Sequence, residues 1–304
     1  MIIRALLAAA MLSIPTLAAA APPPRPGNDC TITVRPDQGT WTVSGYDPFG
    51  GGAAEGVFAV HFTNSGSTAC SFNPSFELSS PPFGLAQGNN NGHRIDYTLV
   101  DLTGGIDVTP SPSRPRPDTS FDRITLDPNQ TETRLFRFAI DTSSITRDGM
   151  FSQDVLIGAQ DGRFSIVGSA PVVLAFNVQS AARMSLAGSY TRTDGRAVVD
   201  LGELRPGRAP VVLQLNVSST SGYDLTVSSL NQGRLRLASS DWTIPYSLAI
   251  GGQPVDLGGT AILPMPDRTG FRIDRLPIDV VIGGMESRRA GTYSDIISIA
   301  VAAR

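Results

Sequence analysis

Apolar and polar residues alternate with a period of two along most of this chain, and the last stretch shows the pattern most clearly. In residues 290–304, Ile297, Ile299 and Val301 fall on one face of an extended segment, and the residues between them are small or polar. This pattern predicts a strand with one buried face. The sequence ends directly after it, so we expect one ladder of its backbone groups to need a partner from elsewhere.

The same alternation predicts short strands throughout the chain, separated by turns rich in Gly, Pro, Asn and Ser. Residues 171–178 are ambiguous, because they could complete the first half of the chain in cis or begin the second half. The strand count and spacing favour an all-β fold of two immunoglobulin-like β-sandwich modules, the C-terminal one lacking its last strand. The clearest predicted strands are 30–34, 57–62, 133–140, 211–217, 223–227, 244–250 and 271–281.

A short motif occurs twice, once near the middle of the chain and once near its end. Each copy has a glycine, any residue, an aromatic residue, a serine, an acidic or amide residue and then aliphatic residues. The matching positions are Gly149 and Gly291, Phe151 and Tyr293, and Ser152 and Ser294. The chain therefore reads as two copies of one module, and we predict an N-terminal module over 21–180 and a C-terminal module over 181–304, with the boundary within 160–182.

Composition supports strands rather than helices. The 304 residues include 31 Gly and 23 Pro, and only 17% are charged. The formal charge is −3, every long cation is Arg, and basic residues form no block that could follow a phosphate backbone. We therefore expect no nucleic-acid partner.

Residues 1–20 have the pattern of a secretory signal peptide, with Arg4 before a short apolar run and three alanines ending at Ala20. No later segment is apolar enough to span a bilayer. We expect export to the periplasm and then the cell surface. Residues 21–29 are rich in proline, so they form a leader that cannot serve as a ladder strand.

The two cysteines, Cys30 and Cys70, predict one disulfide, since an even count in an exported chain is most simply paired. A metal site is the alternative, but only His61 and His93 are available to complete it, and their spacing does not suit a metal. The sequence also offers no paired nucleophile and base, and no glycine-rich loop leading into a helix. We predict no enzyme activity, no catalytic residues, no metal and no cofactor.

Several of these stretches resemble a known family. Gly291-Thr292-Tyr293-Ser294-Asp295, followed by alternating aliphatic residues, resembles the C-terminal signature of spore coat protein U-like domains, the pilin subunits of archaic chaperone-usher pili. The amino-terminal half of such a domain, including its disulfide, is similar to residues 30–34, 46–48 and Cys70. Segments 221–229, 232–235 and 244–248 also resemble pilin sequences.

The resemblance implies donor-strand complementation. In this family an incomplete subunit is held by a periplasmic chaperone, passed to an outer-membrane usher and completed by the amino-terminal extension of a neighbouring pilin. Four or five inserted apolar side chains would contribute on the order of 10 kcal/mol before ordering costs. The acceptor-groove strand would carry Tyr293, Ile297, Ile299 and Val301.

The chain departs from an ordinary pilin because it has two modules and its leader lacks an apolar donor pattern. The resemblance then implies a two-domain tip adhesin, which binds with its N-terminal module and accepts a strand with its C-terminal module. In that family, apolar loops at the far end of the first module contact surfaces, which makes Phe49, Phe83 and Leu85 the candidates here. Phe83 or Leu85 could instead fold back under their own loop. The alternatives are a self-complete secreted surface or coat protein and an exported sugar-binding β-sandwich.

Overall fold

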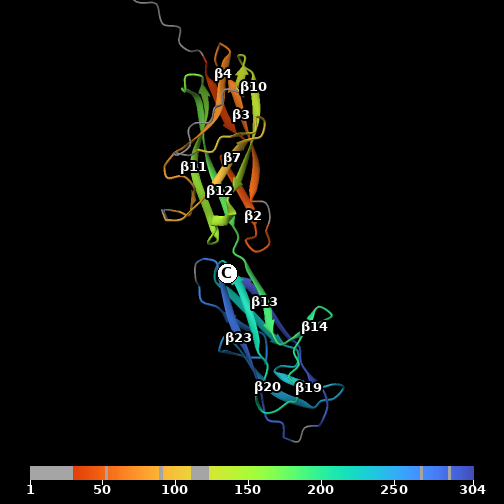
Figure 1. The fold of residues 1–304 in the computed structure, drawn as a ribbon. Helices are drawn as coiled ribbons and strands as arrows, with labels where there is room; N and C mark the ends of the chain where they lie inside the picture. The colour runs from red at the N-terminus through yellow and green to blue at the C-terminus, as the bar shows by residue number, and fades with distance from the viewer. Residues whose placement is uncertain (1–29, 52–53, 89–91, 111–122, 268–269, 287–288) are drawn as a thin grey trace, which may run out of the picture.

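The computed structural model describes residues 30–304 except 52–53, 89–91, 111–122, 268–269 and 287–288. Within these residues the chain is almost entirely β-strand, and the only helical segment is a 3-10 turn, η2 (Thr142–Ser144). Figure 1 shows two β-sandwich modules placed end to end, and the all-β prediction is confirmed. The predicted signal peptide and leader lie outside the described residues.

The first module has two facing sheets. One sheet has the strand order β1 (Ile32–Pro36), β3 (Glu55–Asn64), β10 (Thr131–Ile140), β7 (Tyr97–Asp101) and β8 (Ile106–Asp107). The other has the order β2 (Thr40–Tyr46), β12 (Ile166–Val178), β11 (Gly149–Asp161), β4 (Cys70–Leu78) and β9 (Ile124–Leu126), and the short strands β5 (Leu85–Ala86) and β6 (Arg94–Ile95) extend it. β2 runs parallel to β12, whereas the other pairs are antiparallel.

The second module repeats much of this plan. Its larger sheet has the order β13 (Ala182–Gly188), β17 (Leu213–Ser219), β23 (Arg272–Ile282), β20 (Thr243–Ile250), β19 (Arg234–Leu237) and β24 (Tyr293–Ser294). Short strands β16 (Gly207–Arg208) and β21 (Gln253–Val255) join it, and β14 (Thr191–Thr193) and β15 (Arg196–Val198) form a separate hairpin. The smaller sheet has the order β22 (Ala261–Pro264), β18 (Tyr223–Ser229) and β25 (Ile297–Ala303).

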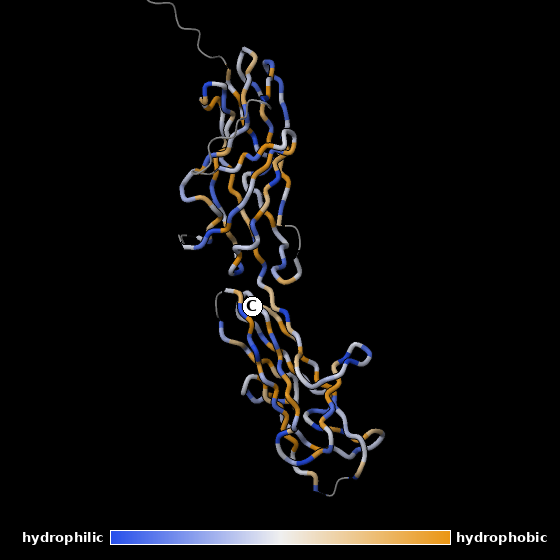
Figure 2. The backbone as a smooth tube through the Cα atoms, viewed as in Figure 1, coloured by the Kyte–Doolittle hydropathy of each residue, from blue (hydrophilic) through white to orange (hydrophobic). Residues whose placement is uncertain are grey.

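Each module buries its own set of apolar side chains. Figure 2 shows hydrophobic and hydrophilic positions alternating along the strands of both modules. One core cluster draws its residues from Ile32 to Val178 and is rich in aromatic rings around Trp41. The other draws on Ala209 to Ile282, and β13 and β25 pack against it with half-buried residues. This alternation is the physical reason that two sheets can close over one core in each module.

Cys30 and Cys70 form a disulfide, as the sequence predicted, with their Cα atoms 5.2 Å apart. It ties Cys30, two residues before β1, to Cys70, the first residue of β4 on the opposite sheet. Both cysteines belong to the first module's core or pack against it. In the described part of the chain, no helix is long and apolar enough to cross a membrane.

Candidate functional site: an open sheet edge in the second module

The two modules share a common arrangement of seven strands. The order β1-β3-β10-β7 matches β13-β17-β23-β20, and β11-β4-β9 matches β25-β18-β22. In the first module, β12 continues the sheet beyond β11 along its whole length. Among the described residues, the second module has no counterpart of β12, so β25 has a ladder partner on one side only, β18.

The two copies of the sequence motif occupy equivalent places in this arrangement. In the first module, Ser152 pairs with β5, and the residues that follow it in β11 pair with β4. In the second module, Ser294 pairs with β19, and β25, which follows it, pairs with β18. Both copies begin at a glycine with positive φ, +114° at Gly149 and +153° at Gly291. A backbone of this kind favours glycine, which explains why both motifs begin with one.

The free edge of β25 presents a regular row of backbone groups. Arg304 N donates to Gly222 O at 2.8 Å, and Leu230 N donates to Ile296 O at 2.9 Å. Because ladder bonds alternate in an antiparallel pair, the even-numbered residues of β25 face β18. The N–H and C=O groups of the odd-numbered residues therefore point to the open side. These residues are Ile297, Ile299, Val301 and Ala303.

The side chains beside this edge are apolar and only half-buried. Ile299 and Val301 pack against the second core from β25, and Met184 and Leu186 do so from β13, the edge strand of the facing sheet. β13 and β25 lie close together, so these side chains line one strip between the two sheets. An apolar strip next to unpaired backbone is the arrangement that an added β-strand can complete.

Comparison with the first module shows what an added strand would cover. Val155 and Ile157 of β11 are fully buried, whereas Ile297 is 36% exposed and Ile299 is half-buried at the equivalent positions of β25. The difference follows from β12, whose Val172, Leu174, Phe176 and Val178 are all buried beside β11. The segment 171–178 therefore completes the first module in cis, which the sequence left open.

The start of β25 is fixed by a polar cluster around Asp295. Its Oδ2 accepts hydrogen bonds from Tyr246 Oη at 2.6 Å and Ser229 Oγ at 2.5 Å, and its Oδ1 accepts from Asn231 N at 2.9 Å. Burial, followed by the hydrogen bond to Asp295, raises the pKa of Tyr246 far above its ordinary value. The start of β25 is thus held in place, although no described strand pairs with its outer side.

The same cluster exists in the first module with an amide in place of the carboxylate. Gln153 is equivalent to Asp295, and its Oε1 accepts from Tyr97 Oη and from Gly84 N, both at 3.0 Å. Its Nε2 donates to Pro82 O at 2.9 Å. A tyrosine hydroxyl therefore binds the acidic or amide residue of the repeated motif in both modules. The recurrence of an acidic or amide residue at this position of the motif could have indicated a shared hydrogen-bond partner.

Tyr293, predicted to belong to the acceptor strand, lies instead in β24 and pairs with Leu237 of β19. Its hydroxyl donates to Arg289 O at 2.8 Å. The chain changes sheets between Ser294 and Ile297, so Tyr293 precedes the open edge and does not line its ladder. Ile297, Ile299 and Val301 lie on the open edge.

Two of the three candidate surface-contact residues face the core of the first module. Leu85 lies in β5 and is fully buried, which corrects the prediction that it contacts surfaces. Phe83 is half-buried, with its ring 4.7 Å from that of Tyr97. Both residues fold back under their own loop, because this loop covers part of the core. This is the alternative that the sequence left open.

Phe49 lies at the junction between the modules. Its ring is 5.9 Å from the ring of Phe271 in the second module, and its carbonyl oxygen accepts a hydrogen bond from Arg183 Nη1 at 2.6 Å. Figure 1 shows this turn, directly after β2, beside the second module. Phe49 is therefore an inter-module contact and not part of the far end, which corrects its assignment to a distal surface loop.

The far end of the first module carries an apolar residue that the sequence analysis missed. The turn between β11 and β12 lies at the end opposite the junction (Figure 1). Phe164 in this turn is 65% exposed, and Ile166 at the start of β12 is also exposed. A single phenylalanine in a polar turn, Asp161-Gly162-Arg163-Phe164-Ser165, was the available signal.

Comparison with known proteins gives structural similarities only. No family model and no curated protein matches the chain. Among solved structures, a chain of the CsuC–CsuE chaperone–tip adhesion subunit complex of Acinetobacter baumannii Csu pili is 11% identical, with a TM-score of 0.44 over 90% of this chain and 99% of that one. The CupB6 tip adhesin of Pseudomonas aeruginosa is 12% identical, with a TM-score of 0.39 over 89% and 94%. CfaE, the adhesive subunit of the CFA/I fimbria of enterotoxigenic Escherichia coli, is 12% identical, with a TM-score of 0.36 over 87% and 91%.

Proposed function

We propose that this chain is an exported pilus subunit of the tip-adhesin type, whose second module accepts a β-strand from a neighbouring polypeptide. The observation that carries the proposal is the one-sided pairing of β25 beside a half-buried apolar strip, where the first module has β12. The role is one of binding and assembly. The family resemblance of the sequence motifs adds the expected setting, in which a periplasmic chaperone, an outer-membrane usher and a neighbouring pilin occupy the edge in turn.

The chemistry of the edge specifies the donor. Alternate backbone groups of β25 would form a ladder with it, and alternate apolar side chains would enter the strip between β25 and β13. β12 has this pattern and occupies the equivalent place in the first module. Residues 171–178 are therefore a suitable test donor for the second module.

A self-complemented variant tests the proposal. A copy of residues 171–178 is appended after Arg304 through a flexible linker of about six residues. We expect thermal unfolding of the second module to shift upward by at least about 10 °C, since several apolar side chains become buried. The control extension has serine in place of the alternating apolar residues Val172, Leu174, Phe176 and Val178 of the copied segment. Equal melting of the two extended proteins would contradict the proposal.

Two substitutions locate the binding site of the donor. Ile299→Asp places a carboxylate inside the strip and should abolish the shift caused by the appended strand, because the charge would be buried without a partner. Ile262→Asp, on the far strand β22, alters a residue that is 63% exposed and should leave the shift intact. Adding the same donor as a separate peptide tests whether the edge also accepts a strand in trans.

For the first module we propose surface contact through the far end, with Phe164 and Ile166 in place of the three candidates named from sequence. The measurement is retention of the purified chain on alkyl-coated beads. We expect Phe164→Ser to reduce retention several-fold. Leu135→Ser, which changes an exposed residue within β10, should not reduce it. Equal retention by both variants would contradict this assignment.

A further inference from the structure

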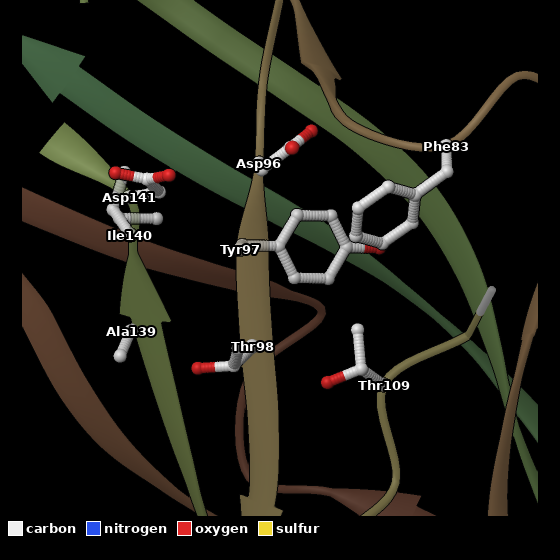
Figure 3. Close-up of a pocket in the computed structure, with 8 residues that line it drawn as sticks. All are labelled: Phe83, Asp96, Tyr97, Thr98, Thr109, Ala139, Ile140 and Asp141. Atoms are coloured by element: carbon white, nitrogen blue, oxygen red, sulfur yellow. The ribbon is translucent and has the colours of Figure 1, made fainter. Parts of the chain in front are cut away.

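A pocket of about 290 Å³ opens on the flank of the first module, away from the open edge of β25. Figure 3 shows it around β7, with Ala139, Ile140 and Asp141 of the β10 end on one side and Phe83 and Thr109 on the other. Its volume is near the lower limit for small-molecule sites, so it suits a ligand of about one ring. Nothing in the proposed strand acceptance uses this pocket.

The lining combines an aromatic ring with many oxygen atoms. Phe83 packs one part of its ring on Tyr97 and is half-buried, so the rest of the ring borders the pocket. Asp96 and Asp141 lie toward one end and Thr98 and Thr109 toward the other (Figure 3). Among the described residues, no basic side chain lines the pocket, so its two carboxylates disfavour phosphate, sulfate and carboxylate ligands on electrostatic grounds.

The backbone of β7 adds a donor and an acceptor. Leu99 N donates to Thr109 Oγ1 and Leu99 O accepts from Val108 N, so Leu99 faces away from β10. Tyr97 is two residues earlier and therefore faces the same side, beyond the end of β8. Among the described residues, β8 does not extend to Tyr97. The backbone N–H and C=O of Tyr97 thus point to the edge of β7 that borders the pocket.

The carboxylates are available as hydrogen-bond acceptors. Asp141 Oδ1 accepts from Ser143 Oγ at 2.6 Å and from Ser143 N at 3.0 Å. These bonds lower the pKa of Asp141, so the group stays ionised at neutral pH. In the described part of the chain, neither the Asp96 carboxylate nor the Thr98 hydroxyl has a hydrogen-bond partner, and both are exposed.

We propose that this pocket binds a neutral monosaccharide unit, such as the end of a surface glycan. Ionised carboxylates accept hydrogen bonds from sugar hydroxyls, the edge amide and the threonine hydroxyl supply donors, and the aromatic ring covers the apolar C–H face of the sugar. A lipid would leave the polar groups unpaired, and the described residues include no group of three metal-ligating side chains.

Saturation-transfer NMR on the full chain tests this site, with methyl α-D-mannopyranoside, methyl β-D-galactopyranoside and N-acetyl-D-glucosamine as probes. We expect transfer to at least one of them, and none to N-acetylneuraminic acid, because the pocket is anionic. Asp96→Asn and Thr98→Val are nearly isosteric changes of exposed residues. Each should weaken the affinity for the bound probe about tenfold. The matched control is Asp127→Asn, an exposed residue in the turn before β10.

The assignment would be overturned by the absence of transfer to any of the neutral probes at millimolar concentration. Equal binding of the anionic sugar, or unchanged binding in both pocket variants, would also overturn it. Displacement of the bound sugar by spermidine at low concentration would indicate an amine site and would also contradict it. None of these results bears on β25, so this proposal and strand acceptance fail or succeed separately.

Discussion

Tyr246 Oη donates a hydrogen bond of 2.6 Å to Asp295 Oδ2, and this contact joins β20 of one sheet to a residue two positions before β25 of the other. The first module makes the equivalent contact between Tyr97 and Gln153. Hydrogen bonds at the start of an edge strand oppose its local opening. The Asp295 cluster therefore keeps β25 in place while its outer side stays open.

Replacement of Asp295 should loosen the second module. Asp295→Ala leaves Tyr246, Ser229 and the Asn231 amide without their acceptor, and we expect a loss of about 3 kcal/mol in the free energy of unfolding. Asp241→Ala removes an exposed carboxylate of the same module and should cost less than about 0.5 kcal/mol. Urea unfolding followed by near-ultraviolet dichroism measures both, and equal losses would contradict the anchoring role.

The buried hydroxyl of Tyr246 predicts a loss of stability at alkaline pH. Burial raises its folded-state pKa above the ordinary value of 10.0, so folding favours the protonated phenol. Its contribution is complete below pH 10 and decreases as the pH rises above that value. In urea melts at pH 9 and pH 11, Tyr246→Phe should therefore lose less stability between the two pH values than the unmodified chain. An equal or larger loss would argue against this contribution.

The two motif strands should respond differently to the same truncation. Ile157 is fully buried between β4 and β12, and Ile157→Ala should cost about 2–5 kcal/mol. Ile299 occupies the equivalent position beside the open edge, and Ile299→Ala should cost about 1 kcal/mol, because its side chain already meets water. Chemical denaturation of both variants provides the comparison. A loss at Ile299 as large as that at Ile157 would mean that the strip is closed.

Removal of the disulfide should affect the first module alone. Cys30 and Cys70 are separated by 40 residues, and closing a loop of this length stabilises by about 4 kcal/mol in the chain-entropy model. The double variant Cys30→Ser, Cys70→Ser should lower the melting temperature of the first module by roughly 10 °C. The transition of the second module is the internal control, and a shift there would contradict the assignment.

The sequence predicts strands well where one face is buried. Thr133 to Ile140 is predicted and lies within β10, and the alternation of Ile297, Ile299 and Val301 appears as β25. The repeated motif predicts two modules because the same backbone and packing requirements recur, as Gly149 and Gly291 show. These features depend on local periodicity, which a single sequence contains.

The sequence predicts the candidate site only in part, because the remaining features depend on contacts between distant residues. Leu85 looks like an exposed loop residue until β6 and β11 pair with its strand. Phe49 acquires its role from Phe271, more than two hundred residues later. The pocket beside β7 likewise combines Phe83, the start of β7 and the end of β10, which no local pattern connects.

Amide hydrogen exchange at single-residue resolution on the full monomeric chain tests strand acceptance most directly. We expect the amides of Ile297, Ile299 and Val301 to exchange almost as fast as free backbone, while those of Val155, Ile157 and Ala159, which face β12, stay protected. An added donor strand should then protect the three amides of β25. Equal protection of both sets in the monomer without a donor would show that the edge already has a partner, and would contradict the account.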